Sequence, residues 1–106
     1  MDIDLVYITA GDADEAGRIA RALVEDRLAA CANIIPAVRS IYWWEGAVQD
    51  DAEAALVAKT RRDLVPALIE RVKELHSYDC PCVVTLPVQA GNPEFLEWIA
   101  DETRPG

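Results

Sequence analysis

The stretch LAACANIIPAVRSIYWWEG, residues Leu28–Gly46, decides the fold of this chain. It is a long apolar and β-branched run, typical of a strand, and it ends in three adjacent aromatic residues and a Glu-Gly turn. A second strand-like run follows from Ala47 to Lys59. Together they predict an unusually long β-hairpin, with a bulge or edge position at Pro36, which has no N–H to donate. Such a hairpin exposes more apolar surface than one small domain can bury, so the sequence predicts self-association.

The bulk composition predicts one domain over residues 1–106 and excludes several classes of partner. The net charge of −9 argues against unspecific binding to nucleic acid and to anionic membranes, both of which favour a basic surface. Two acids stand at the N-terminus where a signal peptide has basic residues, and no apolar run is long enough to cross a membrane. We therefore expect a cytoplasmic protein. The three cysteines suggest no disulfide framework.

Periodicity and capping signals predict seven elements in the order β-α-β-β-α-β-α. Their expected bounds are a strand at 3–9, a helix at 13–28, the hairpin strands at 31–44 and 47–59, a helix at 63–75, a strand at 82–88 and a helix at 93–102. This order predicts an α+β, ferredoxin-like βαββαβ fold with an additional C-terminal helix. Its antiparallel sheet carries two helices on one face, which leaves the second face uncovered unless something packs there.

Three blocks of sequence resemble the CutA family, the divalent-cation tolerance proteins. They are the opening stretch, KTRRDLVPALIERVKELHSYDCPCVVTLPV at residues 59–88, and GNPEFLEWI at residues 91–99. The resemblance runs over nearly the whole chain. It implies a ferredoxin-like protomer in a compact homotrimer, in which long strands join the sheets of neighbouring subunits. It also implies tolerance to copper and other divalent metals, an architecture like that of PII signalling trimers, and no established catalytic reaction.

The segment from His76 to Cys82 holds the candidate metal ligands: His76, Asp79, Cys80 and Cys82. Thiolates and imidazole suit Cu(I) or Zn(II), although a pair of core or edge thiols and a hydrogen-bonding histidine are the plainer readings. Asp79 stands where the resemblance has glutamate, so its carboxylate is one methylene shorter. A copper site proposed for some members aligns here with Ile8, Leu75 and His76, and only His76 can coordinate, so that particular site should not form.

Tyr42, Trp43 and Trp44 lie at the tip end of the hairpin. Adjacent strand residues face opposite ways, so Trp43 and Trp44 cannot both enter one protomer's core. We expect all three in a trimer interface; a ligand-stacking surface and an exposed patch are the alternatives. Acids nearby argue against stacking on nucleic acid.

Two hypotheses for function follow. The first is a homotrimeric binding or regulatory protein for metal tolerance, with no required cofactor and with copper or another divalent metal as its ligand. The second is a PII-like sensor for a small anion, held in intersubunit clefts by Lys59, Arg61, Tyr78 and Trp43; a solvated helix face is the plainer reading of the basic residues. An enzyme is not expected, because no nucleophile, base and oxyanion donor converge in the sequence.

Overall fold

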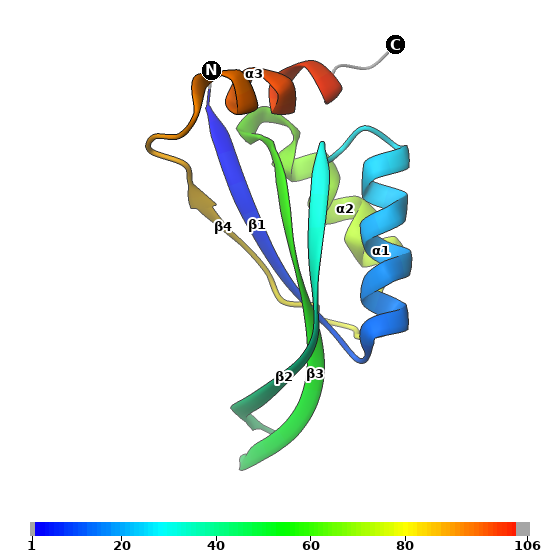
Figure 1. The fold of residues 1–106 in the computed structure, drawn as a ribbon. Coiled ribbons are helices and arrows are strands. Elements are labelled where there is room, and N and C mark those ends of the chain that lie inside the picture. The colour runs from blue at the N-terminus through cyan, green and yellow to red at the C-terminus, as the bar shows by residue number, and fades with distance from the viewer. Residues whose placement is uncertain (1, 104–106) are drawn as a thin grey trace.

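The computed structural model describes residues 2–103 and contains one four-stranded antiparallel sheet with three α-helices (Figure 1). The strands lie in the order β2-β3-β1-β4, which is the ferredoxin-like arrangement that the sequence predicts. In chain order the elements are β1 (Ile3–Ala10), α1 (Ala13–Glu25), β2 (Cys31–Trp44), β3 (Ala47–Arg61), a 3₁₀ turn (Arg62–Leu64), α2 (Val65–Leu75), β4 (Val83–Pro87) and α3 (Pro93–Glu102).

Alternation along the strands builds the core between the sheet and the helices α1 and α2. In β1, Val6, Ile8 and Ala10 are fully buried in the main cluster, which also contains Leu23 of α1 and Leu68 of α2. A smaller cluster forms where α3 packs Ile99 against Ile3 and Ala30. Among the described residues, no helix is long and apolar enough to cross a membrane.

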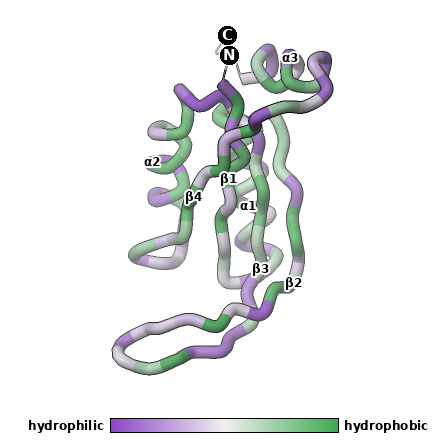
Figure 2. Tube along the Cα trace, turned by 90° about the vertical axis from the view of Figure 1, so that its left-hand side faces the viewer, coloured by the Kyte–Doolittle hydropathy of each residue, from purple (hydrophilic) through white to green (hydrophobic). Residues whose placement is uncertain are grey.

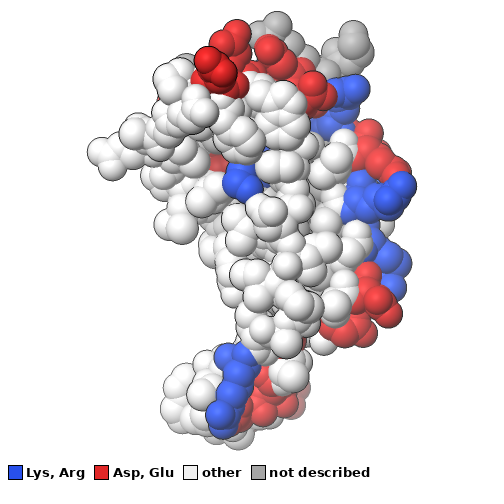
Figure 3. Space-filling view, viewed as in Figure 1, with Lys and Arg blue, Asp and Glu red and all other residues white. Residues whose placement is uncertain are grey.

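The three helices leave most of the second face of the sheet uncovered. Leu5 pairs with Leu86 and Tyr7 with Val84 across β1 and β4, and these four side chains alternate with the residues that face the helices. Val84 and Leu86 are 55% and 62% exposed. In the view of Figure 1 the strands stand in front of α2, and Figure 3 shows that the surface between α1, α3 and the hairpin is mostly uncharged.

The hairpin projects from the sheet as an arm, formed by residues 38–53, which pair only with each other in this chain. The ladder between β2 and β3 is irregular from Ile35 to Val38, and β2 lies at the edge of the sheet, which agrees with the bulge or edge position predicted at Pro36. Glu45 and Gly46 both adopt positive φ at the tip, as the tightest hairpin turns require. The arm makes the molecule elongated, 44 × 26 × 22 Å (Figure 2).

Two of the predicted elements, the first helix and the last strand, are shorter in the structure. The first helix ends at Glu25 rather than Leu28 because Arg27 adopts a left-handed φ of 60°, and the N–H groups of Leu28 and Ala29 both donate to the Leu23 carbonyl. The fourth strand begins at Val83, after Pro81, and ends at Pro87 rather than Val88.

Candidate functional site

The loop between α2 and β4, residues 76–82, runs under the core beside the point where the arm leaves the sheet (Figure 1). His76 follows the last residue of α2, and its side chain is fully buried. Its Nε2 lies 2.7 Å from the Thr9 carbonyl oxygen, and its Nδ1 accepts the Tyr78 N–H at 3.0 Å. Because a carbonyl only accepts, the ring carries its proton on Nε2, and both nitrogens are engaged.

Glu15 of α1 fastens the other side of this loop. Its buried carboxylate accepts the N–H of Gly11 and the N–H of Ser77, both at 2.8 Å. Burial by itself raises the pKa of Glu15, but the hydrogen bonds from Gly11 and Ser77 together outweigh it, so the pKa lies below its usual value. Glu15 therefore holds a negative charge 4.0 Å from the His76 ring.

Tyr78 connects the loop to the base of the arm. Its ring lies 4.6 Å from that of His76, and its hydroxyl donates to Glu53 of β3 at 2.8 Å. Burial raises the pKa of Tyr78, and the hydrogen bond to the Glu53 carboxylate raises it further. The hydroxyl is therefore a donor over the whole physiological pH range.

The four predicted metal ligands share this loop but differ in their surroundings. Cys80 and Cys82 are exposed free thiols, and Asp79 is also exposed, whereas His76 is buried and hydrogen-bonded at both nitrogens. Among residues 2–103, no group of three or more His, Cys, Asp or Glu side chains is arranged to hold a metal ion. The assignment of these residues to a metal stays a prediction.

The four predicted cleft residues lie in three separate places in one chain. Lys59 and Arg61 lie two residues apart on one face of β3; Lys59 donates to Asn33 at 2.6 Å, whereas Arg61 is largely buried beside the end of α3. Arg61 donates to the Thr103 carbonyl, and its Nε is buried without a hydrogen-bond partner, 3.5 Å from an Asp63 oxygen. Tyr78 belongs to the loop and Trp43 to the arm. A cleft formed by all four would require neighbouring chains, and it stays a prediction.

The three predicted interface aromatics all lie on the arm and are exposed. Trp43 is 74% exposed and Trp44 57%, on opposite faces of β2, while Tyr42 donates to Asp51 across the hairpin at 2.7 Å. Alternation predicts that the two tryptophans cannot both enter the core of one chain, and in the structure neither does. Their place in a trimer interface stays a prediction.

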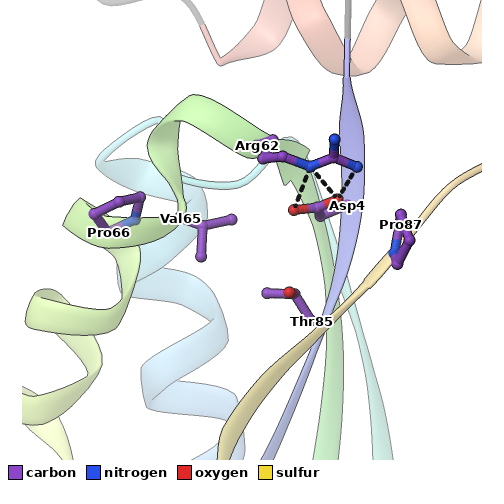
Figure 4. Close-up of a pocket in the computed structure, with 6 residues that line it drawn as sticks. All are labelled: Asp4, Arg62, Val65, Pro66, Thr85 and Pro87. Atoms are coloured by element: carbon purple, nitrogen blue, oxygen red, sulfur yellow. Dashed lines mark hydrogen bonds and ion pairs between the residues drawn. The ribbon is translucent and has the colours of Figure 1, made fainter.

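Sequence reasoning missed a groove of about 440 Å³ beside the start of α2 (Figure 4). At one side, Arg62 donates to both oxygens of the buried Asp4, the closest pair at 2.8 Å, and it also contacts Asp2. The other walls are Val65, Pro66, Thr85 and Pro87. The sequence did contain one sign of this pair. Asp4 is an acid at a buried position of a central strand, and a buried acid needs a partner. Because the Arg62 guanidinium is already paired with Asp4 and Asp2, this groove offers no free positive charge to an anion.

The family model for the CutA1 divalent ion tolerance protein matches residues 4–102. The Divalent-cation tolerance protein CutA of Thermus thermophilus is 48% identical over 94% of this chain and 97% of its own. Protein CutA 1, chloroplastic, of Oryza sativa is 47% identical over 94% of this chain, which spans only 56% of that relative's length.

Solved structures agree with these sequence matches. The crystal structure of CutA1 from Oryza sativa superposes with a TM-score of 0.96 at 44% identity, covering 100% of this chain and 97% of that one. The Archaeoglobus fulgidus structure, described as a periplasmic CutA, gives a TM-score of 0.93 at 40% identity over 96% and 99% of the two chains. This chain belongs to the CutA1 divalent ion tolerance protein family.

Proposed function

We propose that this protein serves divalent-cation tolerance as a homotrimeric binding or regulatory protein rather than an enzyme. The observation that carries the proposal is the family match over residues 4–102, together with relatives named divalent-cation tolerance proteins that align over nearly their whole length. The names of relatives place them in chloroplasts and, for the Archaeoglobus fulgidus protein, in the periplasm. For this chain we propose a cytoplasmic location, which its three free cysteines support, because cytosolic thiols are kept reduced.

The trimer is supported by two apolar surfaces that one chain leaves uncovered. They are the open face of the sheet, with Val84 and Leu86, and the arm, with Ile41, Trp43 and Trp44. Large exposed apolar patches mark association sites in proteins of this size. Figure 1 shows the arm extending beyond the helices at one end of the sheet.

Metal binding in the proposal is assigned to the α2–β4 loop, with copper or another divalent ion as the ligand. The candidate donors that the sequence identifies all lie on this one loop, namely His76, Asp79, Cys80 and Cys82. Calorimetric titration of the full chain with Cu(II) and with Zn(II) tests this. We expect saturable binding that is weakened in the His76→Ala, Cys82→Ser double variant and kept in a Lys73→Ala control. If neither Cu(II) nor Zn(II) binds saturably, the proposal is wrong.

The alternative is a PII-like signalling role, in which a small anionic ligand binds in clefts between subunits. The observation that favours it is the placement of Lys59 and Arg61 two residues apart on one face of β3, with the Arg61 Nε buried and lacking a hydrogen-bond partner. Thermal-shift screening with phosphate-containing and carboxylate-containing metabolites tests it, because a ligand of the native state raises the melting temperature. A shift that Lys59→Ala abolishes supports the sensor; no shift with any of these anions contradicts it.

A further inference from the structure

The arm is joined to the sheet by one continuous strand and one interrupted strand. Strand β3 runs without a break from the arm into the sheet, where Ala54 pairs with Ala10 of β1. The ladder between β2 and β3 is irregular from Ile35 to Val38, so the second connection is interrupted where the arm begins. A two-stranded hairpin is marginally stable by itself and twists strongly. We therefore expect the direction of the arm to depend on a contact outside the hairpin.

Tyr78 makes such a contact. Its hydroxyl donates at 2.8 Å to Glu53, the last residue of the arm on β3. The other side-chain hydrogen bonds of the arm, donated by Arg39 and Tyr42, end on acids within the arm itself. Among residues 2–103, the Tyr78–Glu53 bond is thus the side-chain hydrogen bond that ties the arm to the rest of the chain.

The folded core fixes the position of Tyr78. Its N–H donates to His76 Nδ1 at 3.0 Å, and its ring lies 4.6 Å from the His76 ring. His76 is in turn held against the Thr9 carbonyl at 2.7 Å. The Tyr78 hydroxyl lies beside the turn after β1, since a Cβ added at Gly11 would be 3.7 Å from its oxygen. The hydroxyl is therefore presented to the arm from a place that the core sets.

The two segments that this bond joins carry different parts of the proposed function. The arm bears the exposed Trp43 and Trp44, and Tyr78 is followed directly by Asp79 of the α2–β4 loop. We propose that the Tyr78–Glu53 hydrogen bond is a latch that sets the direction in which the arm leaves the sheet. It thereby ties the presentation of the association surface to the position of the loop. The latch rests on contacts within one chain, whereas its effect on assembly rests on the proposed trimer.

The direction of the arm can be measured by pulsed electron paramagnetic resonance. Spin labels are placed at two exposed positions, Arg18→Cys on α1 and Ala47→Cys at the arm tip, in a chain whose three native cysteines are replaced by serine. Labelled chain is mixed with excess unlabelled chain, so that each measured distance lies within one chain. Tyr78→Phe keeps the ring beside His76 but removes the donor. It should broaden or shift the distance distribution.

Tyr42→Phe is the matched control, because it also removes a tyrosine hydroxyl that donates to an acid of the arm, but within the arm. It should leave the distribution as it is in the labelled parent chain. Glu53→Ala should reproduce the effect of Tyr78→Phe, and the two changes together should add nothing further, because each removes the same contact. A distribution that Tyr78→Phe leaves unchanged, or that Tyr42→Phe alters equally, overturns the latch.

Sedimentation over a dilution series tests the consequence for assembly. Tyr78→Phe should dissociate at about tenfold higher concentration than the wild-type chain, since it lacks a hydrogen bond to a charged group, whereas Tyr42→Phe should follow the wild type. Equal dissociation of Tyr78→Phe and wild type would overturn the link to assembly. If the wild type sediments as a single chain at every concentration, the proposed trimer fails, and the label distances still decide whether the latch exists.

Discussion

At the residue scale, the buried groups around the α2–β4 loop hold the loop in place. Glu15 and His76 face each other at 4.0 Å and engage backbone groups on three segments, at Thr9, Gly11 and Ser77–Tyr78. In a capping box, Asp12 would accept the Glu15 N–H and Glu15 would bond back to the Asp12 N–H. The structure has the first half, in which the Asp12 carboxylate accepts the Glu15 N–H at 2.8 Å. The Glu15 side chain instead reaches Gly11 and Ser77, because the fold places the second loop beside it.

Replacing Glu15 by Gln should destabilise the protein by about 1–3 kcal/mol at neutral pH. The NH₂ group of glutamine cannot accept a hydrogen bond, so either the Gly11 N–H or the Ser77 N–H loses its acceptor. Urea denaturation followed by circular dichroism measures the loss. Glu70→Gln is the matched control, since Glu70 is exposed on α2 and its side chain, among residues 2–103, makes a single 3.5 Å contact, with Lys73. Equal losses in the two variants would contradict a structural role for the Glu15 carboxylate.

The same carboxylate should make stability depend on pH. Because the folded pKa of Glu15 is lowered, its stabilisation is present above the usual carboxyl pKa and is lost as the pH falls through the folded value. The difference in unfolding free energy between wild type and Glu15→Gln should therefore be largest near pH 7 and shrink in acid. Denaturation at a series of pH values from 7 to 3 measures it; a difference that grows on acidification would contradict the assignment.

At the scale of elements, capping and turn chemistry locate most boundaries, and tertiary contacts move the rest. Helix α3 begins at Pro93 behind its cap Asn92, as the Gly-Asn-Pro-Glu motif predicts. Strand β3 continues two residues beyond the predicted Lys59 because Thr60 and Arg61 pair with Asp4 and Ile3. No local signal reports such a pairing, since it depends on where β1 lies.

The first turn of α1 offers a test of the cap. Asp12→Ala should cost about 1 kcal/mol of stability, because the Glu15 N–H loses its acceptor. Asp12→Asn is the control and should stay close to wild type, since an asparagine side chain also caps well. Thermal denaturation of the three proteins measures the effect. An alanine variant as stable as the asparagine variant would show that the cap contributes nothing.

At the scale of the whole molecule, one chain buries a complete core yet leaves its arm and one sheet face apolar. Burying a large apolar side chain contributes roughly 1.5–3 kcal/mol, so even a few of these residues can drive association. The exposed tryptophans of the arm are the strongest candidates, because aromatic residues dominate the energetics of interfaces. The cleft expected from Lys59, Arg61, Tyr78 and Trp43 depends on the same assembly.

Association is tested by sedimentation velocity at micromolar concentration. We expect a species of three times the 11.7 kDa mass of one chain. The Trp43→Ala, Trp44→Ala double variant should have a mass closer to that of the single chain, because the arm loses its largest apolar surface. The control Lys73→Ala, on the outer face of α2, should leave the mass unchanged. A wild-type protein that sediments as a single chain would refute the trimer.

The sequence by itself determined the element order, the long hairpin with its bulge at Pro36, and the family, because periodicity, proline chemistry and turn residues act locally. It also brought the candidate ligands to one loop. Only the tertiary structure decided that His76 is buried and engaged at both nitrogens while Cys80 and Cys82 are exposed. The partners of His76 come from Thr9 and Tyr78, and burial depends on segments that meet only when the chain folds. The Asp4–Arg62 pair stayed hidden for the same reason, since 58 positions separate its members.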